Sequence, residues 1–387
     1  MAEDINRTSA VEVAMLRTPR HLFLRGAGQA YADETVYAKT DARGPSISAA
    51  PQARIVAMML EQLALRPGQR VMEVGASAGY NAALLAAIVG DAGRVVTIEA
   101  NEDLVEQART NLAAADITTV DVVHGDGAFG YAEGAPYDRI VATADAHETP
   151  AAWLEQLAPG GRLVVPLRLR GAASRSIIFE RYEGGWRDQG SELAAFMPLR
   201  GIGDDAGRLV PLTPHQDVVL QVHNDQDVDA AALAGVLETE RRKIWIDVFF
   251  PPKVPYEWMD LWLACRLDNA IMQMNVQPTA VEHGVVTPMF GWGAMATTRG
   301  ADLAYLTTRP TPTRPDGSRL YEVGVIGHGP RGWDLAHHVS EEIRTWDATY
   351  RSGSVHFEIP DAPVQADPSV GRFVLARPRH PITVTWK

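Results

Sequence analysis

The sequence predicts an α/β fold, with a doubly wound and mostly parallel sheet followed by a C-terminal α+β domain. Short apolar segments typical of buried strands alternate with helical segments over residues 55–167, and this alternation predicts a parallel sheet with helices on both faces. A glycine-rich, polar segment at 201–207 interrupts the pattern, as a domain boundary does. The chain has 387 residues, which favours two domains over one. We therefore expect a first domain at 1–201 and a second at 208–387.

The strands and helices of the first domain are expected in alternation. Turn residues bound the segments, and the strands are rich in apolar and β-branched residues. The expected helices lie at 55–65, 81–89, 101–114 and 150–157, and the expected strands at 70–74, 94–98, 119–123, 138–143 and 162–167. Two antiparallel strands at 175–181 and 196–199, with a hairpin turn at 183–186, would complete the sheet.

The second domain has weaker patterns, which favour a mixture of sheet and helix. Segments 321–326 and 382–386 have the composition of strands. Residues 334–348 have the spacing of an amphipathic helix, whose apolar face would consist of Leu335, Val339, Ile343 and Trp346. Seven of the nine tryptophans lie in this half, and we assign most of them to its core. The aromatic run 245–262 is also a candidate lining of a peptide groove.

A glycine turn after the strand at 70–74 is the first sign of a nucleotide site. Gly75 and Gly79 frame the turn, and bare backbone at the start of the next helix lets a nucleotide approach. Glu99 ends the following strand, where a carboxylate can accept hydrogen bonds from both ribose hydroxyls. The turn lacks the middle glycine that a pyrophosphate requires, and with the preceding acid Glu73 it suits the cationic S-adenosylmethionine. On the alternative interpretation, the two glycines are simple turn residues.

Further segments in the expected order strengthen this interpretation. Gly125-Asp126-Gly127 follows the strand at 119–123, and an acid at that strand end can accept the adenine amino group. Thr143 ends the fourth strand. The residues that we predict to bind the cofactor lie at these strand ends and in one upstream segment: Ser46, Ile47, Ser48, Glu73, Gly75, Ala76, Ser77, Gly79, Glu99, Ala100, Gly125, Asp126, Gly127 and Thr143.

Over about residues 10–201, these segments resemble the protein-L-isoaspartate O-methyltransferases. Pro19-Arg20-His21-Leu22-Phe23 is similar to the family's Pro-Arg-His-x-Phe segment, Ser46-Ile47-Ser48 to its Thr-Ile-Ser active-site loop, and Phe196-Met197-Pro198-Leu199 to a late strand. The resemblance implies a Rossmann-like methyltransferase sheet, S-adenosylmethionine as methyl donor and S-adenosyl-L-homocysteine as product. It also implies that Ser48 and Ser46 hold the acceptor carboxylate as catalytic residues. Otherwise a serine here caps the helix that follows.

Differences from the family pattern concentrate where the acceptor would bind. Ser77 replaces the central glycine of the first motif, which narrows the backbone freedom of the turn. In the segment 143–150, Asp145 and His147 stand in place of small apolar residues, and Arg200 stands where some members have threonine. We predict that Asp145, His147 and Arg200 bind the substrate. The methyl-donor site is then retained, while the choice of acceptor has changed.

The first functional hypothesis is a peptide-modifying enzyme. The resemblance includes a branch with a C-terminal extension, associated with ribosomally made, post-translationally modified peptides. An enzyme of this branch would methylate an aspartyl side chain in a constrained peptide, and the ester would cyclise to an aspartimide (succinimide). The alternatives are a repair enzyme for L-isoaspartyl residues of damaged proteins, a binding protein that retains S-adenosylmethionine without turnover, and a small-molecule carboxyl methyltransferase.

Composition argues against several other classes of partner. The net charge of -12 disfavours nucleic acid, because phosphate binding needs a basic face. No apolar stretch approaches a membrane span, and the acidic start at 1–4 is unlike a signal peptide. The single cysteine, Cys265, allows no internal disulfide, and we expect a buried thiol in a cytoplasmic protein.

We also predict no metal site. Adjacent helix residues such as His337 and His338 face different directions and have no cluster of acids and histidines around them. His283 and His328 have the surroundings of loop histidines. The oligomeric state stays open.

Overall fold

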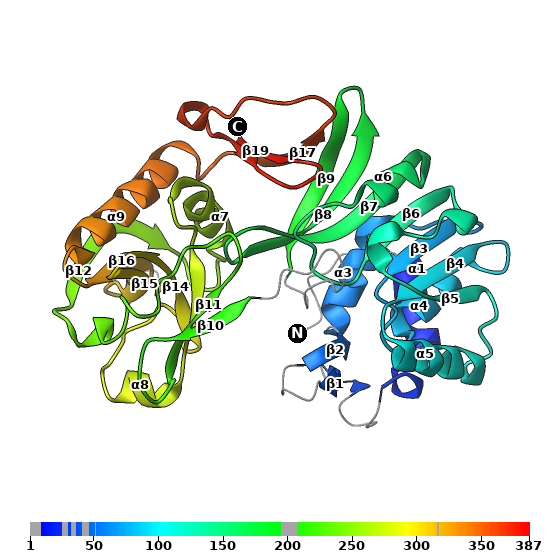
Figure 1. The fold of residues 1–387 in the computed structure, drawn as a ribbon, viewed down its shortest axis with the longest axis horizontal. Helices are drawn as coiled ribbons and strands as arrows, with labels where there is room; N and C mark the ends of the chain where they lie inside the picture. The colour runs from blue at the N-terminus through cyan, green and yellow to red at the C-terminus, as the bar shows by residue number, and fades with distance from the viewer. Residues whose placement is uncertain are drawn as a thin grey trace.

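The computed structural model describes residues 9–24, 30–31, 52–194, 207–315 and 317–387, together with the backbone of 36–40 and 46–50. Two halves lie side by side, one built around a sheet with a parallel part covered by helices and the other around an antiparallel sheet (Figure 1). This arrangement confirms the predicted α/β class with an additional C-terminal sheet domain. The expected boundary segment lies almost wholly outside the described residues.

The first sheet has the strand order β18-β19-β17-β9-β8-β7-β6-β3-β4-β5. Its parallel part consists of β3 (Arg70–Val74), β4 (Arg94–Glu99), β5 (Val120–His124), β6 (Tyr137–Ala142) and β7 (Leu157–Arg170). The hairpin of β8 (Ala173–Tyr182) and β9 (Gly185–Leu193) continues the sheet in antiparallel fashion. The hairpin turn lies where the sequence predicts it, but its second strand is β9, and the strand expected at 196–199 lies outside the described residues.

Helices cover both faces of the parallel strands (Figure 1). They are α1 (Ser9–Arg17), α3 (Ala53–Leu63), α4 (Tyr80–Val89), α5 (Glu102–Ala114) and α6 (Ala151–Glu155). The side-chain oxygen of Asn101 accepts the Leu104 N–H at 3.3 Å and so caps α5. α3 ends two residues earlier than predicted, because Ala64 adopts a left-handed backbone (φ +47°). The alanine- and leucine-rich α4 is buried almost all round, since it contacts both the sheet and α1.

Several short elements complete the picture. β1 (Val36–Thr40) and β2 (Ser46–Ala50) form a separate antiparallel pair, of which only the backbone is described. Short 3-10 turns occur at Arg20–Leu22, Gly127–Phe129, Ala132–Gly134, Val236–Glu238 and Pro368–Val370.

The second sheet is antiparallel, in the order β10-β11-β13-β14-β15-β16-β12. Its strands are β10 (Arg208–Pro211), β11 (Val218–Val222), β12 (Arg242–Phe250), β13 (Met272–Val276), β14 (Gly293–Arg299), β15 (Asp302–Pro310) and β16 (Tyr321–His328). The helices of this half are α7 (Glu257–Arg266), α8 (Pro278–Glu282) and α9 (Gly332–Thr349). α9 packs on this sheet through the predicted apolar face, because Leu335, Val339, Ile343 and Trp346 are all buried.

The last described strands return to the first sheet. β17 (Val355–Pro360) pairs antiparallel with β9, and β19 (Ile382–Trp386) and β18 (Arg372–Leu375) extend the sheet beyond it. Residues 208–387 therefore form the second sheet and also one edge of the first. The expected division into 1–201 and 208–387 did not anticipate this return.

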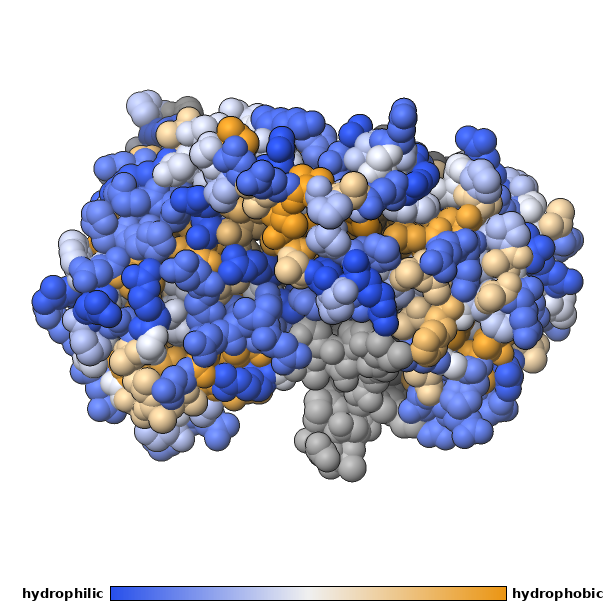
Figure 2. Space-filling model, turned by 45° about the horizontal axis from the view of Figure 1, so that its top comes forward, coloured by the Kyte–Doolittle hydropathy of each residue, from blue (hydrophilic) through white to orange (hydrophobic). Residues whose placement is uncertain are grey.

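An apolar core runs through both halves. One buried cluster includes Trp153 and Phe179 of the first half and Trp262 and Tyr305 of the second, and a smaller cluster lies under α1, α3 and α4. The surface seen in Figure 2 is mainly hydrophilic, with apolar residues exposed near the middle of the view and in further groups on both sides. No described helix is long and apolar enough to cross a membrane.

The locations of Cys265 and His283 agree with the sequence, and that of His328 does not. Cys265 is buried, as predicted, and burial raises the pKa of its thiol to about 12. His283 follows α8 on the surface. His328 is instead the buried last residue of β16, so the prediction of a loop histidine was wrong there.

Candidate functional site

The carboxyl ends of β3, β4, β5 and β6 meet at one edge of the first sheet. The parallel register pairs Val74 with Ala142, and Glu99 with His124. Ligands of open α/β sheets bind at this edge, outside the strand ends. The fold therefore brings together the predicted residues that follow these ends, which are the loop 75–79, Glu99, Ala100, Gly125, Asp126, Gly127 and Thr143.

The glycine loop after β3 depends on two glycines with positive φ. Gly75 has φ +102° and Gly79 has φ +86°, values that side chains disfavour. A Cβ atom on Gly75 would lie 2.6 Å from the Thr143 Oγ1 atom. That hydroxyl donates to the Gly75 carbonyl at 2.7 Å and thus ties the loop to the end of β6. The two glycines and the Thr143 hydrogen bond therefore fix the conformation of the loop.

Ser77 adopts the left-handed conformation at the tip of this loop, with φ +45°. Serine pays a steric cost there that glycine does not. The Ser77 N–H donates to the Glu99 Oε2 atom at 2.9 Å. The strained residue therefore helps to fix the carboxylate at the end of β4.

Backbone hydrogen bonds fix both carboxylate oxygens of Glu99 at the end of β4. Its Oε1 atom accepts the Asn101 N–H at 3.1 Å, and its Oε2 atom accepts the Ser77 N–H. A carboxylate offers about four acceptor positions, so both oxygens keep capacity for hydroxyl donors. The side chain is partly exposed at the open edge of the sheet. These features fit an adenosine-containing cofactor.

Asp126 is positioned at the end of β5 by a short 3-10 turn. Its Oδ1 atom accepts the Ala128 N–H at 2.9 Å, while the buried Trp153 indole donates to the Gly127 carbonyl at 2.8 Å. The Cβ side of Gly125 has no heavy atom within 4 Å. A flat ring can therefore approach the backbone beside Asp126.

Glu73 lies beneath the glycine loop. It is fully buried, and its two oxygens accept hydrogen bonds from Asn81 Nδ2 at 2.8 Å and Thr97 Oγ1 at 2.6 Å. Burial raises the pKa of Glu73 to about 7, and the two hydrogen bonds oppose this shift. Through these hydrogen bonds, the Glu73 side chain links β3 to α4 and β4 beneath the loop.

The predicted acceptor segment after β6 is held by hydrogen bonds to neighbouring elements. The Asp145 Oδ1 atom accepts the Ser174 hydroxyl at 2.9 Å. The His147 Nδ1 atom lies 2.8 Å from an Arg168 guanidinium nitrogen, and it must accept this bond because guanidinium only donates. Asp145 and His147 thus take part in the scaffold of the segment, while their contact with a substrate stays a prediction.

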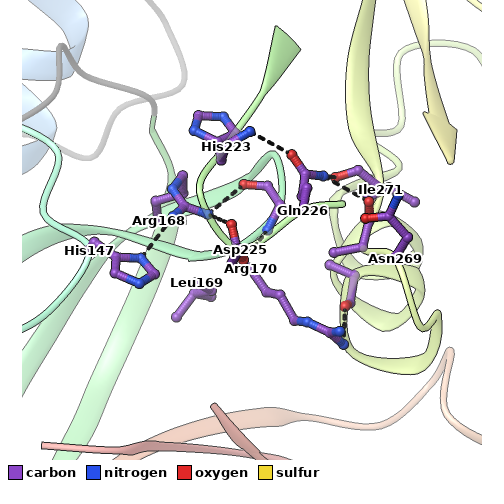
Figure 3. Close-up of polar contacts among 12 residues, drawn as sticks. His147, Arg168, Leu169, Arg170, His223, Asp225, Gln226, Asn269 and Ile271 are labelled. Carbon is purple, nitrogen blue, oxygen red and sulfur yellow. Dashed lines mark hydrogen bonds and ion pairs between the residues drawn. The ribbon is translucent and has the colours of Figure 1, made fainter. Parts of the chain in front are cut away.

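Residues of the C-terminal half complete this scaffold. The Arg168 Nη1 atom donates to Asp225 Oδ1 at 2.8 Å, as Figure 3 shows beside the His147 contact. Arg377 donates to the carbonyl of His147, and Arg379 pairs with the buried Glu148 at 2.7 Å. Three side chains from beyond residue 207 therefore fix the segment that follows Thr143.

The same junction carries further contacts between the halves (Figure 3). The Asp225 Oδ2 atom accepts the Gly171 N–H at 3.1 Å, and Arg170 donates to backbone carbonyls of α7, including Ala264 at 3.0 Å. Although burial acts to raise it, Arg168 and the Gly171 N–H hold the pKa of Asp225 below its usual value. The two halves are thus joined by charge as well as by apolar packing.

Sequence reasoning missed most of these supporting residues. Asn81, Trp153 and Arg168 belong to no motif, and only the fold places them beside the predicted loops. The side chains of Ser46, Ile47 and Ser48 and the whole of Arg200 lie outside the described residues, so their predicted roles stay predictions. Among the described residues, no group of three or more histidine, cysteine or acidic side chains is arranged to hold a metal ion.

Comparison with known proteins identifies a family for the first half. A profile of the protein-L-isoaspartate(D-aspartate) O-methyltransferase family matches residues 1–201. The chain is 39% identical over 204 residues to protein-L-isoaspartate O-methyltransferase 2 of Archaeoglobus fulgidus, covering 52% of this chain and 90% of that protein. It is 42% identical over 195 residues to the corresponding protein of Methanoregula boonei, covering 50% and 86%.

A solved structure described as a protein-L-isoaspartate O-methyltransferase is also similar. It aligns with 91% of this chain and 92% of its own, at 20% identity and a TM-score of 0.49. The two sequence relatives each match only about half of this chain, and the profile match ends at residue 201.

Proposed function

This chain belongs to the protein-L-isoaspartate(D-aspartate) O-methyltransferase family, and on that premise we propose that it methylates an aspartyl side chain of a constrained, ribosomally made peptide. As a member of this family it is an enzyme that uses S-adenosylmethionine and releases S-adenosyl-L-homocysteine. The proposal adds the acceptor and its fate: the methyl ester closes to an aspartimide. We also propose that the enzyme acts in the cytoplasm.

Binding and orientation account for the methyl transfer, without a general base. The cofactor, when bound, supplies an electrophilic methyl group on a sulfonium. An aspartyl carboxylate is already ionised near pH 7, since its ordinary pKa is about 4. The protein must therefore desolvate the carboxylate and hold one oxygen in line with the methyl carbon. We assign the cofactor ribose to Glu99, its adenine to Asp126, and the acceptor carboxylate to Ser48 and Ser46.

The second step follows from the chemistry of the ester. A backbone nitrogen next to the ester attacks its carbonyl, forms a five-membered imide and expels methanol. The net product is one water lighter than the unmodified peptide. Starting from an isoaspartyl ester, hydrolysis of the same ring by water to aspartate would amount to repair. Starting from an aspartyl ester, it installs a new aspartimide.

The observation that carries the proposal is that side chains of the C-terminal half form hydrogen bonds and an ion pair with the acceptor segment and with Arg168 beside it. Asp225, Arg377 and Arg379 reach Arg168, His147 and Glu148 from outside the part that matches the family profile. This additional support of the acceptor segment by the C-terminal half favours a dedicated peptide substrate over many unrelated, unfolded chains.

Repair of isoaspartyl residues is the second candidate. The names of the relatives favour it, because both are called protein-L-isoaspartate O-methyltransferases. On this alternative, short unstructured isoaspartyl peptides would be good substrates, and residues 208–387 would be dispensable for recognition. A small-molecule methyltransferase is a further alternative that the same assay addresses.

Mass spectrometry with isotopically labelled S-adenosylmethionine tests the proposal. The acceptors are aspartyl and isoaspartyl forms of one peptide sequence, each prepared as a linear and as a macrocyclic chain. We expect label on the aspartyl form of the constrained peptide, followed by loss of methanol. Rapid labelling of linear isoaspartyl peptides alone would establish repair instead. No labelling of any peptide, with the cofactor still bound, would favour a small-molecule acceptor.

A further inference from the structure

A groove of about 740 Å³ opens between the first sheet and the second half of the chain. One wall comes from the β7–β8 turn and the start of β8, and the other from the segment before α7 and from the second sheet. Its lining includes Ser174, Arg175, Tyr256, Asp260, Phe290 and Trp292.

This groove begins next to the acceptor segment. β7 runs parallel to β6 and continues beyond the end of β6, past a bridge between Ala146 and Leu167, to the turn before β8. Ser174 lines the groove and donates to Asp145 at 2.9 Å. Asp145 stands only two residues after Thr143, a span of at most about 7 Å along an extended chain. A peptide with its acceptor carboxylate at the cofactor loop can therefore continue into the groove.

Aromatic side chains form the apolar part of the groove. Phe290 stacks on Trp292 with ring centres 5.0 Å apart, and Tyr256 meets the edge of Phe290 at 5.7 Å. Trp292 is 47% exposed, an unusual exposure for so large a ring. Stacked, partly exposed rings of this kind offer a rigid surface to an aromatic or large aliphatic side chain.

Two charged residues that line the groove, Lys253 and Asp260, have no ion-pair partner among the described residues. Arg175 pairs with Glu257 at 2.6 Å and stacks on Trp258 at 3.9 Å, so these charges are satisfied. The Oδ1 atom of Asp260 is buried and, within the described part of the chain, accepts no hydrogen bond. Burial, followed by the charge of Glu257, raises the pKa of Asp260 to about 7. Buried acceptors without a donor are rare in native proteins, so the Asp260 carboxyl group, which lines the groove, favours a ligand that brings a donor.

We propose that this groove binds a segment of the acceptor peptide in which an aromatic or large apolar side chain neighbours a lysine or arginine, and that the cation pairs with Asp260. The inference rests on the proposed function and specifies its substrate class. Arg175 and Glu257 neutralise each other, and the other cation of the lining, Lys253, is exposed to solvent, so Asp260 is the lining charge that a peptide cation can complement. The groove thus selects peptides by residues that flank the methylated position.

Binding of peptides that cannot be methylated tests this inference separately from catalysis. The full chain, saturated with S-adenosyl-L-homocysteine, is titrated with peptides whose acceptor aspartate is replaced by asparagine. One series carries a Phe-Lys pair a few residues before or after that position, a second carries Phe-Glu, and a third Ala-Ala. We expect at least one Phe-Lys peptide to bind about ten-fold more tightly than its Phe-Glu and Ala-Ala counterparts, by isothermal titration calorimetry.

Two variants identify the groove as the site. Asp260→Asn should abolish most of the preference for lysine, and Trp292→Ala the preference for phenylalanine, while thermal unfolding reports whether either variant is folded. Asp334→Asn makes the same change of charge at an exposed position of α9 and should leave both preferences intact. Equal binding of the three peptide series, or a lysine preference that survives in folded Asp260→Asn, would overturn the inference. Because these peptides have no acceptor carboxyl group, their binding is measured independently of methylation. A failure of the methylation assay therefore does not affect this test.

Discussion

At the residue scale, the site includes positions with an unfavourable backbone conformation and a carboxyl group that is buried away from solvent. Ser77 occupies a left-handed position between two glycines that also have positive φ. Glu73 is a fully buried carboxylate directly below. Both residues lie within the loop motif that the sequence identifies, but their conformational and ionisation states become apparent only in the fold.

Replacement of Ser77 should reveal the cost of its conformation. Ser77→Gly removes both the side chain and the steric conflict, while Ser77→Ala removes the hydroxyl and keeps the conflict. We expect the glycine variant to be more stable than the alanine variant by about 0.5–1 kcal/mol, because glycine adopts positive φ without a Cβ clash. Urea unfolding of the two variants measures this difference. Equal stability would mean that the loop relaxes to another conformation in the alanine variant.

Glu73 should make the stability of the first half depend on pH. Its pKa is raised from 4.5 to about 7 in the folded state, so the folded protein holds a proton that the unfolded chain releases. This contribution to stability is present below about pH 4.5 and is lost as the pH rises towards 7. Relative to Glu73→Gln, the wild type should lose on the order of 1–3 kcal/mol between pH 5 and pH 7.5.

Chemical unfolding of both proteins at the two pH values is the measurement. The difference between them isolates this carboxyl group from the other titrating groups. A difference that stays constant with pH would mean that Glu73 is ionised in the folded protein across this range.

At the element scale, the informative feature is the segment after β6. The parallel strands lie within a few residues of their predicted positions for the most part, because apolar runs and glycine turns mark them locally. The partners of this segment could not be predicted in the same way. Arg168 and Arg379 contact it across 21 and 231 residues of sequence, and Asp225 contacts Arg168 across 57. No local pattern records such pairs.

Asp225→Asn should weaken acceptor use without affecting cofactor binding. The change removes the charge that pairs with Arg168, whose side chain is only 6% exposed, and so loosens the contact between Arg168 and His147. Breaking a pair of this kind costs about 1–3 kcal/mol after allowance for the partial exposure of Asp225. We expect kcat/KM for the peptide to fall about ten-fold, while the dissociation constant of S-adenosylmethionine stays the same.

A matched control comes from the surface. Asp361 pairs with Arg181, and both side chains are 48% exposed. Asp361→Asn should therefore leave kcat/KM and stability nearly unchanged. If both variants lost activity equally, or if Asp225→Asn weakened cofactor binding instead, the acceptor segment would not be the element that this ion pair positions.

At the scale of the whole molecule, the two halves form one interleaved structure. The sequence led to two consecutive domains, since a glycine-rich segment separates two regions of different composition. The return of β17, β18 and β19 could not be predicted, because pairing at a sheet edge depends on backbone hydrogen bonds that any extended segment can make. Of the candidate site, the cofactor loops were therefore accessible from sequence, and the contribution of the C-terminal half was not.

We expect both halves to unfold in one transition. Trp386 of β19 is 2% exposed and packs against Trp262 of α7 with ring centres 5.3 Å apart, so it belongs to both halves at once. Trp386→Ala should destabilise the protein by about 3–5 kcal/mol. In differential scanning calorimetry, the single endotherm should move to lower temperature as a whole, and S-adenosyl-L-homocysteine should raise it. Two separate endotherms, of which only one responds to the mutation, would contradict this view.

The pairing of β17 with β9 also has a consequence for synthesis on the ribosome. Arg187 and Glu358 face each other across this pair and are 171 residues apart in the chain. At about 5–20 residues per second, roughly 10–35 s pass between the emergence of the two strands. During that time the outer edge of β9 exposes unpaired backbone, which is prone to aggregate. The nascent enzyme should therefore depend on chaperones that shield this edge until β17 has been translated.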